Sequence, residues 1–187
     1  MGDAPLAAHE HLEHAEHAAH AGDPFISLVS ITIAVLAVVA AAAASLETVE
    51  SSSAITSASK AVLAQDQATD NWNFYEAKSL KKNLYAIAAD QGGPKAADYA
   101  KKAKSEGDGQ DQAQADAKRL EGVRDEALKA SDTHEGRHHR LTIGATMLEI
   151  AIALATIAIV TKRRWPWMIA VGLGAIGAVV AALAYIG

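Results

Sequence analysis

The chain has 187 residues, of which 50% are hydrophobic, 21% are charged and only 5% are aromatic. It contains no cysteine, which excludes a disulfide scaffold, a thiolate-bound zinc or iron–sulfur site and a thiol nucleophile. Its net charge of −5 argues against nucleic acid as a partner. The mean hydropathy of +0.06 is typical of a soluble domain. That average conceals three long stretches that are almost free of charge, with the charged residues gathered elsewhere.

These three stretches predict an all-α integral membrane protein. The predicted transmembrane helices are residues 24–46, 141–161 and 165–187. The first and third contain no charged residue, and the second contains only Glu149. A helix rises about 1.5 Å per residue, so about 20 apolar residues cross the hydrocarbon core of a bilayer. Each stretch is long enough to do so.

Basic residues near the spans predict the orientation. The short turn 162–164 joins the second and third spans and is entirely basic, whereas residues 1–23 contain no Lys or Arg. The positive-inside rule therefore predicts a cytoplasmic turn and N-terminus, with residues 47–140 in the periplasm. The cations beside the spans are also candidates for binding lipid headgroups. They are Arg137, Arg140, Lys162, Arg163 and Arg164.

Residues 47–140 are polar and rich in helix-forming residues, which predicts an extramembrane helical hairpin. No signal ends the first span, so its helix is expected to continue into the first arm until Asp90–Pro94, where two glycines and a proline predict a turn. Ser105–Gly109 is expected to interrupt the second arm. An apolar stripe is predicted along the first arm, and the hairpin is expected to need a partner because its apolar surface is thin. The stripe comprises Ile55, Ala58, Val62, Thr69, Trp72, Leu80, Leu84 and Ile87.

The N-terminal segment, residues 1–23, repeats His and Glu. Its candidate metal ligands are His9, His11, His14, His17 and His20. Side chains three residues apart are neighbours on a helix, so weak binding of a divalent metal is one interpretation. A pH-responsive element and a polar interaction helix are the alternatives. No other cofactor is indicated.

Glu149 is the one acidic or basic residue inside a predicted span. At that depth a charged side chain costs roughly 2.5–3.5 kcal/mol on insertion scales, which makes it a functional candidate. Helix–helix hydrogen bonding, an ion or proton path and contact with lipid remain open interpretations. Its candidate hydroxyl partners are Thr142, Thr146, Thr156, Ser27, Ser30 and Thr32.

The third span contains small residues at a spacing of four, which predicts a close helix–helix contact. This packing ladder comprises Ala170, Gly174, Ala178 and Ala182. Gly172–Gly177 also fits the spacing of a dinucleotide-binding loop, but no strand precedes it and it lies inside a span. No set of catalytic residues is found, so the chain is not expected to be an enzyme.

The first arm carries an aromatic and basic segment, Trp72–Lys81. Trp72, Tyr75, Lys78 and Ser79 form a predicted contact patch on it, either for another subunit or for the second arm. Together with the His-rich start and the two closing spans, this segment resembles the bacterial membrane family known as domain of unknown function 4337. The family often has Gln at the position of Glu76. The resemblance implies a bacterial inner-membrane protein and implies no activity.

Three functions are compatible with these features. The main hypothesis is a non-enzymatic membrane protein that self-associates into a helical scaffold within the lipid bilayer. An oligomeric ion channel or a metal- or proton-responsive transporter that uses Glu149 is the second. The third is a sensor or accessory subunit that binds another membrane protein.

Overall fold

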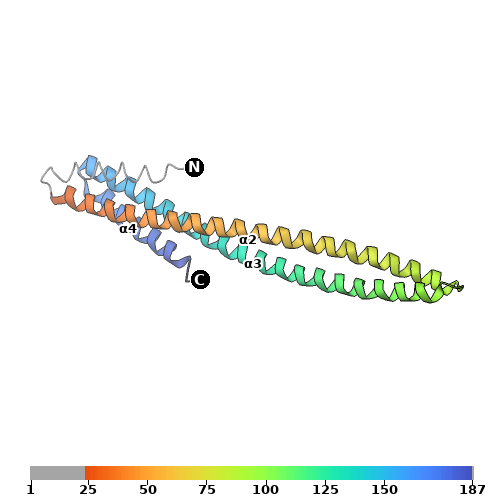
Figure 1. Ribbon diagram of the computed structural model, residues 1–187. Coiled ribbons are helices and arrows are strands. Elements are labelled where there is room, and N and C mark those ends of the chain that lie inside the picture. The colour runs from red at the N-terminus through yellow and green to blue at the C-terminus, as the bar shows by residue number, and fades with distance from the viewer. Residues whose placement is uncertain (1–23, 187) are drawn as a thin grey trace. The chain divides into compact units, whose positions relative to one another are not determined.

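The computed structural model describes residues 24–186 and is all-α over that range, with no strand. Its helices are α2 (Pro24–Asp90), α3 (Ala96–Thr161) and α4 (Arg164–Leu183), labelled as in Figure 1. Each helix contains a stretch that is long and apolar enough to cross a membrane. The predicted fold class is therefore confirmed as an all-α chain with three membrane-compatible helices.

The two long helices are less interrupted than the sequence suggests. As predicted, α2 continues from the first apolar stretch to Asp90 without a break. The expected interruption at Ser105–Gly109 is wrong, because α3 runs through it. A glycine in a helix costs only about 1 kcal/mol relative to alanine. Flanking contacts offset that cost: Glu106 forms a 2.8 Å ion pair with Lys78, and Gln110 accepts a 3.3 Å hydrogen bond from Lys82.

The turn between α2 and α3 lies where glycines and proline predict it. Gly92 and Gly93 have φ angles of +77° and +98°, which glycine adopts without a steric penalty. The amide of Gln91 donates to the carbonyl of Ile87 at 3.1 Å, and that of Gly92 donates to Ala89 at 3.1 Å. These bonds satisfy carbonyls at the end of α2, as a glycine C-cap does.

The chain divides into two compact units, which we describe separately. The hairpin unit comprises Ile55–Asp132, and its two helical arms run side by side in opposite directions (Figure 1). Its buried apolar side chains are alanines with one leucine: Ala61, Ala64, Ala68, Ala113, Ala117 and Leu120. The larger aliphatic residues of the predicted stripe are exposed instead, at 65% for Ile55 and 72% for Leu80. Alanine contacts thus hold the arms together, and the stripe faces outward.

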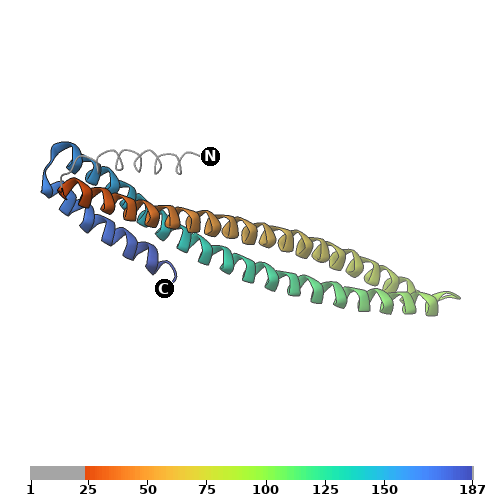
Figure 2. The same ribbon diagram turned by 60° about the vertical axis from the view of Figure 1, so that its left-hand side comes forward.

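The span unit comprises Met1–Ala54 and Thr133–Gly187, and its described part contains three helical segments packed together (Figure 2). The beginning of α2, the end of α3 and α4 contribute to one apolar core. Its members are mostly small or β-branched: Val29, Ile33, Ala37, Ala40, Ala43, Ala145, Leu148, Ile152, Ala155 and Ala170. At one end Trp167 donates a 3.2 Å hydrogen bond from Nε1 to Oγ1 of Thr32 and packs edge-on against Phe25.

Helices α3 and α4 approach so closely that backbone meets backbone. A Cβ added to Gly144 would lie 2.8 Å from the carbonyl oxygen of Gly177, and a Cβ on Gly177 would lie 2.9 Å from that of Gly144. Only hydrogen atoms on both Cα atoms permit this approach. The contact departs from the predicted ladder. Ala170 and Gly174 are buried and Ala178 is half-buried, but Ala182 is exposed.

The spacing of the buried residues explains that departure. A strict spacing of four drifts around a helix, whereas the alternation of four and three keeps residues on one face. The alternating pattern begins at Ala170 and Gly174 in α4 and continues through Gly177, Ala181 and Ala184. Ala181 is half-buried, and the other positions are buried. Gly144, on the facing helix, is a packing residue that the sequence did not reveal.

Candidate functional site

A cluster of ionisable side chains lies where the apolar stretches of α2 and α3 give way to charged sequence. Glu47 and Glu50 lie one helical turn apart, directly after the first apolar stretch. His134 and His138 lie one turn apart on α3, shortly before the second. Tyr185 follows the end of α4. All of these residues belong to the span unit.

Glu50 is the centre of this cluster. Its side chain is only 6% exposed, and its carboxylate accepts hydrogen bonds from Nδ1 of His134 at 2.6 Å and from the hydroxyl of Tyr185 at 2.9 Å. A guanidinium nitrogen of Arg137 lies 3.9 Å from the same carboxylate, and the guanidinium stacks 5.4 Å from the Tyr185 ring centre. One carboxylate on α2 therefore connects to α3 and to the chain end beyond α4.

These contacts decide the charge of Glu50. Burial raises the pKa of its carboxyl, but the hydrogen bonds from His134 and Tyr185 and the positive charges of His134 and Arg137 outweigh burial. The net effect holds the pKa of Glu50 below its ordinary value. Glu50 is accordingly an anion at neutral pH, with donors already arranged around it.

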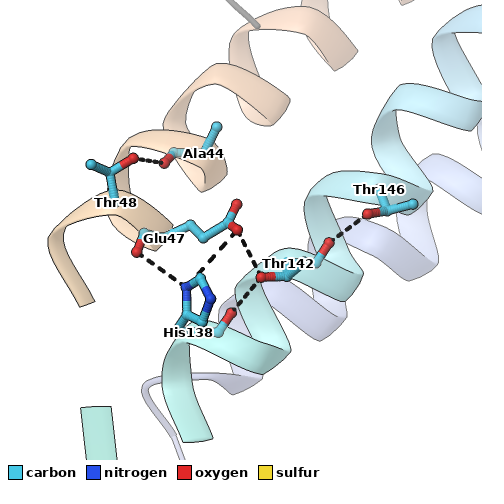
Figure 3. A network of polar contacts seen from close by, with 6 residues as sticks. All are labelled: Ala44, Glu47, Thr48, His138, Thr142 and Thr146. Atoms are coloured by element: carbon cyan, nitrogen blue, oxygen red, sulfur yellow. Dashed lines mark hydrogen bonds and ion pairs between the residues drawn. The ribbon is translucent and has the colours of Figure 1, made fainter. Parts of the chain in front are cut away.

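A second set of contacts surrounds Glu47 (Figure 3). The hydroxyl of Thr142 lies 2.8 Å from the Glu47 carboxylate and 3.0 Å from the carbonyl of His138, so its one proton can be donated to either oxygen. Nδ1 of His138 lies 3.4 Å from the backbone carbonyl of Glu47 and 3.9 Å from its carboxylate. Glu47 therefore joins α2 to α3 one turn before Glu50.

The arrangement attaches three helical segments to one another through polar and charged contacts. Its carboxylates are paired with donors of the same chain. Within residues 24–186, no group of three or more His, Asp or Glu side chains is arranged to hold a metal ion. We name Glu47, Glu50, His134, Arg137, His138, Thr142 and Tyr185 the boundary cluster.

Acid is expected to weaken the span unit through Glu50. A carboxyl whose pKa is lower in the folded state than in the unfolded state adds stability above its unfolded pKa, and this stability is lost as the pH falls through the folded pKa. The free energy of unfolding should therefore decrease as the pH falls below the ordinary pKa of a glutamate carboxyl. Glu50→Gln should show a smaller decrease over the same range, measured by denaturant titration. Equal slopes for both proteins would contradict this role of Glu50.

The structure places the residues predicted from sequence in several environments. The predicted histidines, His9–His20, lie outside the described residues. Glu149 lies on the exposed side of α3. The predicted contact patch meets the second arm: Trp72 donates from Nε1 to Glu121 at 2.9 Å and packs edge-on against Tyr75, and Lys78 pairs with Glu106. Of its two alternatives, contact with the second arm is the one these bonds support.

The predicted headgroup-binding cations also differ from one another. Arg137 contacts Glu50, and Arg140 donates to the carbonyl of Leu183 at 3.2 Å, where it satisfies the end of α4. Lys162 and Arg163 are exposed, and Arg164 lies 5.7 Å from the ring centre of Phe25. Arg137 and Arg140 thus both have partners within the chain.

Sequence reasoning missed the boundary cluster, although a signal for it exists. Two acidic residues one turn apart follow the first span, and two histidines one turn apart precede the second. In a hairpin, the end of one span and the start of the next lie at the same membrane surface. Residues of opposite charge flanking those two points are therefore expected to meet.

A protein-family model described as "Domain of unknown function (DUF4337)" matches residues 25–187. The match covers all three helices and the turns between them. Neither a search of curated proteins nor a search of solved structures gave a match.

Proposed function

The chain belongs to the DUF4337 family, whose function is unknown, and we propose from its geometry that it is a non-enzymatic, self-associating helical scaffold of the bacterial inner membrane. The apolar stretches of its helices anchor it in the bilayer. The hairpin unit lies in water, because its sequence carries the charged residues of both signs. The basic turn 162–164 faces the cytoplasm and the hairpin unit faces the periplasm.

The observation that carries this proposal is the exposed stripe of the hairpin unit. Ile55, Val62, Leu80, Leu84 and Ile87 lie along one side of α2 and are between 58% and 72% exposed. Their spacing in multiples of about three and a half residues keeps them in line over the length of the arm. We call these five residues the stalk stripe. Large aliphatic side chains aligned in water are typical of a surface that another protein covers.

A second copy of the chain fits this stripe. Leu80 and Leu84 are separated by Lys81, Lys82 and Asn83, which are polar or charged like the residues that flank a coiled-coil seam. The alanine core holds the two arms together without the larger side chains, which leaves the stripe available for packing between copies. Heptad-like aliphatic seams pair readily with themselves, so no other partner is required.

The test is the mass of the 187-residue protein extracted in detergent. A particle larger than one chain is expected, and a stable monomer over the accessible concentration range would refute the proposal. The variant with Leu80→Ser, Leu84→Ser and Ile87→Ser is expected to shift the particle towards smaller mass, because serine removes most of the apolar area of the stripe.

Matched substitutions on α3 provide the control. Val123 and Leu128 are 44% and 45% exposed and lie off the stripe, so Val123→Ser with Leu128→Ser should leave the mass unchanged. Loss of association in the control but not in the stripe variant would indicate that the interface lies on α3. Circular dichroism of each variant establishes whether the helices remain formed.

A further inference from the structure

Glu149 has no partner within the described part of the chain. It is exposed on α3, and neither a hydrogen bond nor an ion pair joins it to another residue between 24 and 186. Four of its six candidate hydroxyl partners form hydrogen bonds to other residues. The hydroxyl of Thr142 lies within hydrogen-bond distance of the Glu47 carboxylate and the His138 carbonyl. The hydroxyls of Thr146, Thr156 and Thr32 donate to the backbone carbonyls four residues earlier in their own helices. Ser30 is buried without a hydrogen bond.

Glu149 lies within a line of mostly polar or small residues on α3. The line is formed by Thr142, Thr146, Glu149, Ala153, Thr156 and Val160. Its spacing alternates between four and three residues, which is the pattern of a left-handed helix–helix seam, over about five turns. Thr142 and Thr156 are half-buried and the other four residues are exposed. The buried core of the span unit uses other faces of the same helix, at Leu148, Ala151 and Ala155.

We propose that this line, which we call the Glu149 seam, is an interface with a second copy of the chain, and that the Glu149 carboxyls of the two copies hydrogen-bond to each other. The inference rests on the self-association proposed above and adds an interface within the membrane to the one on the hairpin unit.

The chemistry of Glu149 favours a copy of the same chain as the partner. No Lys, Arg, His or Asp lies in residues 24–46, 141–161 or 165–187, so the spans of another copy offer Glu149 itself as the matching ionisable group. A protonated carboxyl is both a donor and an acceptor, and two such groups satisfy each other through reciprocal hydrogen bonds. Copies inserted in the same direction place this residue at the same depth of the bilayer.

The neighbours of Glu149 permit the required approach. Thr146 and Ala153 lie one turn before and one turn after it, and both are small enough for two helix backbones to come close. The threonine hydroxyls already donate to carbonyls of their own helix, but their oxygens can still accept a hydrogen bond. A carboxyl on the seam therefore has acceptors on either side as well as the matching carboxyl of the other copy.

Single cysteines provide the test, since the 187-residue chain contains no cysteine of its own. Thr146→Cys and Ala153→Cys place a thiol on the seam at exposed positions. Val38→Cys and Ile176→Cys are controls on α2 and α4, at residues that are 68% and 54% exposed. Each protein is reconstituted in phosphatidylethanolamine–phosphatidylglycerol vesicles and oxidised with copper–phenanthroline. Disulfide-linked dimers are then measured by non-reducing electrophoresis.

We expect dimers from the two seam cysteines and not from the two controls. Dimers from the controls alone, or equal dimer yields from seam and control cysteines, would overturn the inference. If the detergent-extracted protein is larger than a monomer but the seam cysteines form no dimer, the seam is wrong and the proposed scaffold remains. A monomeric particle without seam dimers refutes both.

Substitution of Glu149 in the Ala153→Cys protein tests the contribution of the carboxyl to association separately from that of the other seam residues. Glu149→Ala should weaken association roughly three- to tenfold, as the loss of one interhelical hydrogen bond does in a membrane. Glu149→Gln should retain the dimer yield of its parent, because an amide also donates and accepts. Equal yields from the alanine and glutamine variants would exclude the carboxyl pair. Both substitutions lie on the exposed side of α3, so the core of the span unit is unchanged.

Discussion

Replacement of Glu50 by leucine is expected to lower the free energy of unfolding of the span unit by about 3 kcal/mol. The substitution leaves His134, Arg137 and the Tyr185 hydroxyl without the carboxylate that they share. Removal of one partner from a buried charged group costs about 3–5 kcal/mol. The lower end applies here, because the His134 and Arg137 side chains are 29% and 37% exposed and water replaces part of the contact.

The measurement uses tryptophan fluorescence during detergent denaturation. The chain has three tryptophans, and a Trp72→Phe background leaves Trp165 and Trp167, which both belong to the span unit. Glu50→Gln should cost less than Glu50→Leu, since its amide still accepts hydrogen bonds. Glu135→Leu is the control, because Glu135 is an exposed carboxylate on α3 next to His134. A loss for Glu135→Leu as large as for Glu50→Leu would show that the cluster contributes no specific stability.

Replacement of Gly177 by alanine is expected to destabilise the span unit by about 1–3 kcal/mol. The new methyl group would lie 2.9 Å from the carbonyl oxygen of Gly144 and 2.9 Å from Cβ of Met147, so α3 and α4 would have to separate. Gly144→Ala should act similarly, because its methyl group would meet the carbonyl of Gly177 and the backbone nitrogen of Ala181 at 3.0 Å. Neither obstacle is the movable end of a flexible side chain.

Gly172→Ala is the matched control for these substitutions. Gly172 lies on the same helix as Gly177, and nothing is within 4 Å of the position its methyl group would occupy. Alanine favours the helical backbone by up to about 1 kcal/mol relative to glycine, so this variant should be as stable as the parent or slightly more stable. The expected result is that Gly177→Ala lowers the free energy of unfolding and that Gly172→Ala leaves it unchanged or raises it slightly. Destabilisation by Gly172→Ala as large as that by Gly177→Ala would point to a general intolerance of bulk in α4.

The features that were predictable from sequence depend on long or local patterns. Charge-free stretches of about 20 residues predict membrane-compatible helices wherever they occur. The turn after Asp90 follows from two consecutive glycines and a proline, whose backbone preferences act locally. The continuation of α2 beyond Ser45 was also predictable, because no residue there disfavours a helix.

The features that were not predictable depend on which face of each helix meets its neighbour. Gly107 and Gly109 suggested a break, yet contacts of Lys78 and Lys82 keep that part of α3 helical. Aliphatic residues ordinarily mark the buried side of a helix, but in the hairpin unit alanine occupies that side and Leu80 is outside. The boundary cluster and the contact of Gly144 with Gly177 join residues that are far apart in sequence, and no periodicity within one helix specifies such pairs.

The alanine core of the hairpin unit has a thermal consequence. Alanine loses almost no side-chain entropy on burial and buries little apolar area. Each alanine therefore adds a small hydrophobic free energy to folding and loses little entropy. The heat capacity change of unfolding scales with the apolar area that becomes exposed. Within a single chain, the stability of this unit therefore varies only gently with temperature. Any additional apolar area that is buried when the stalk stripe is covered makes that dependence steeper.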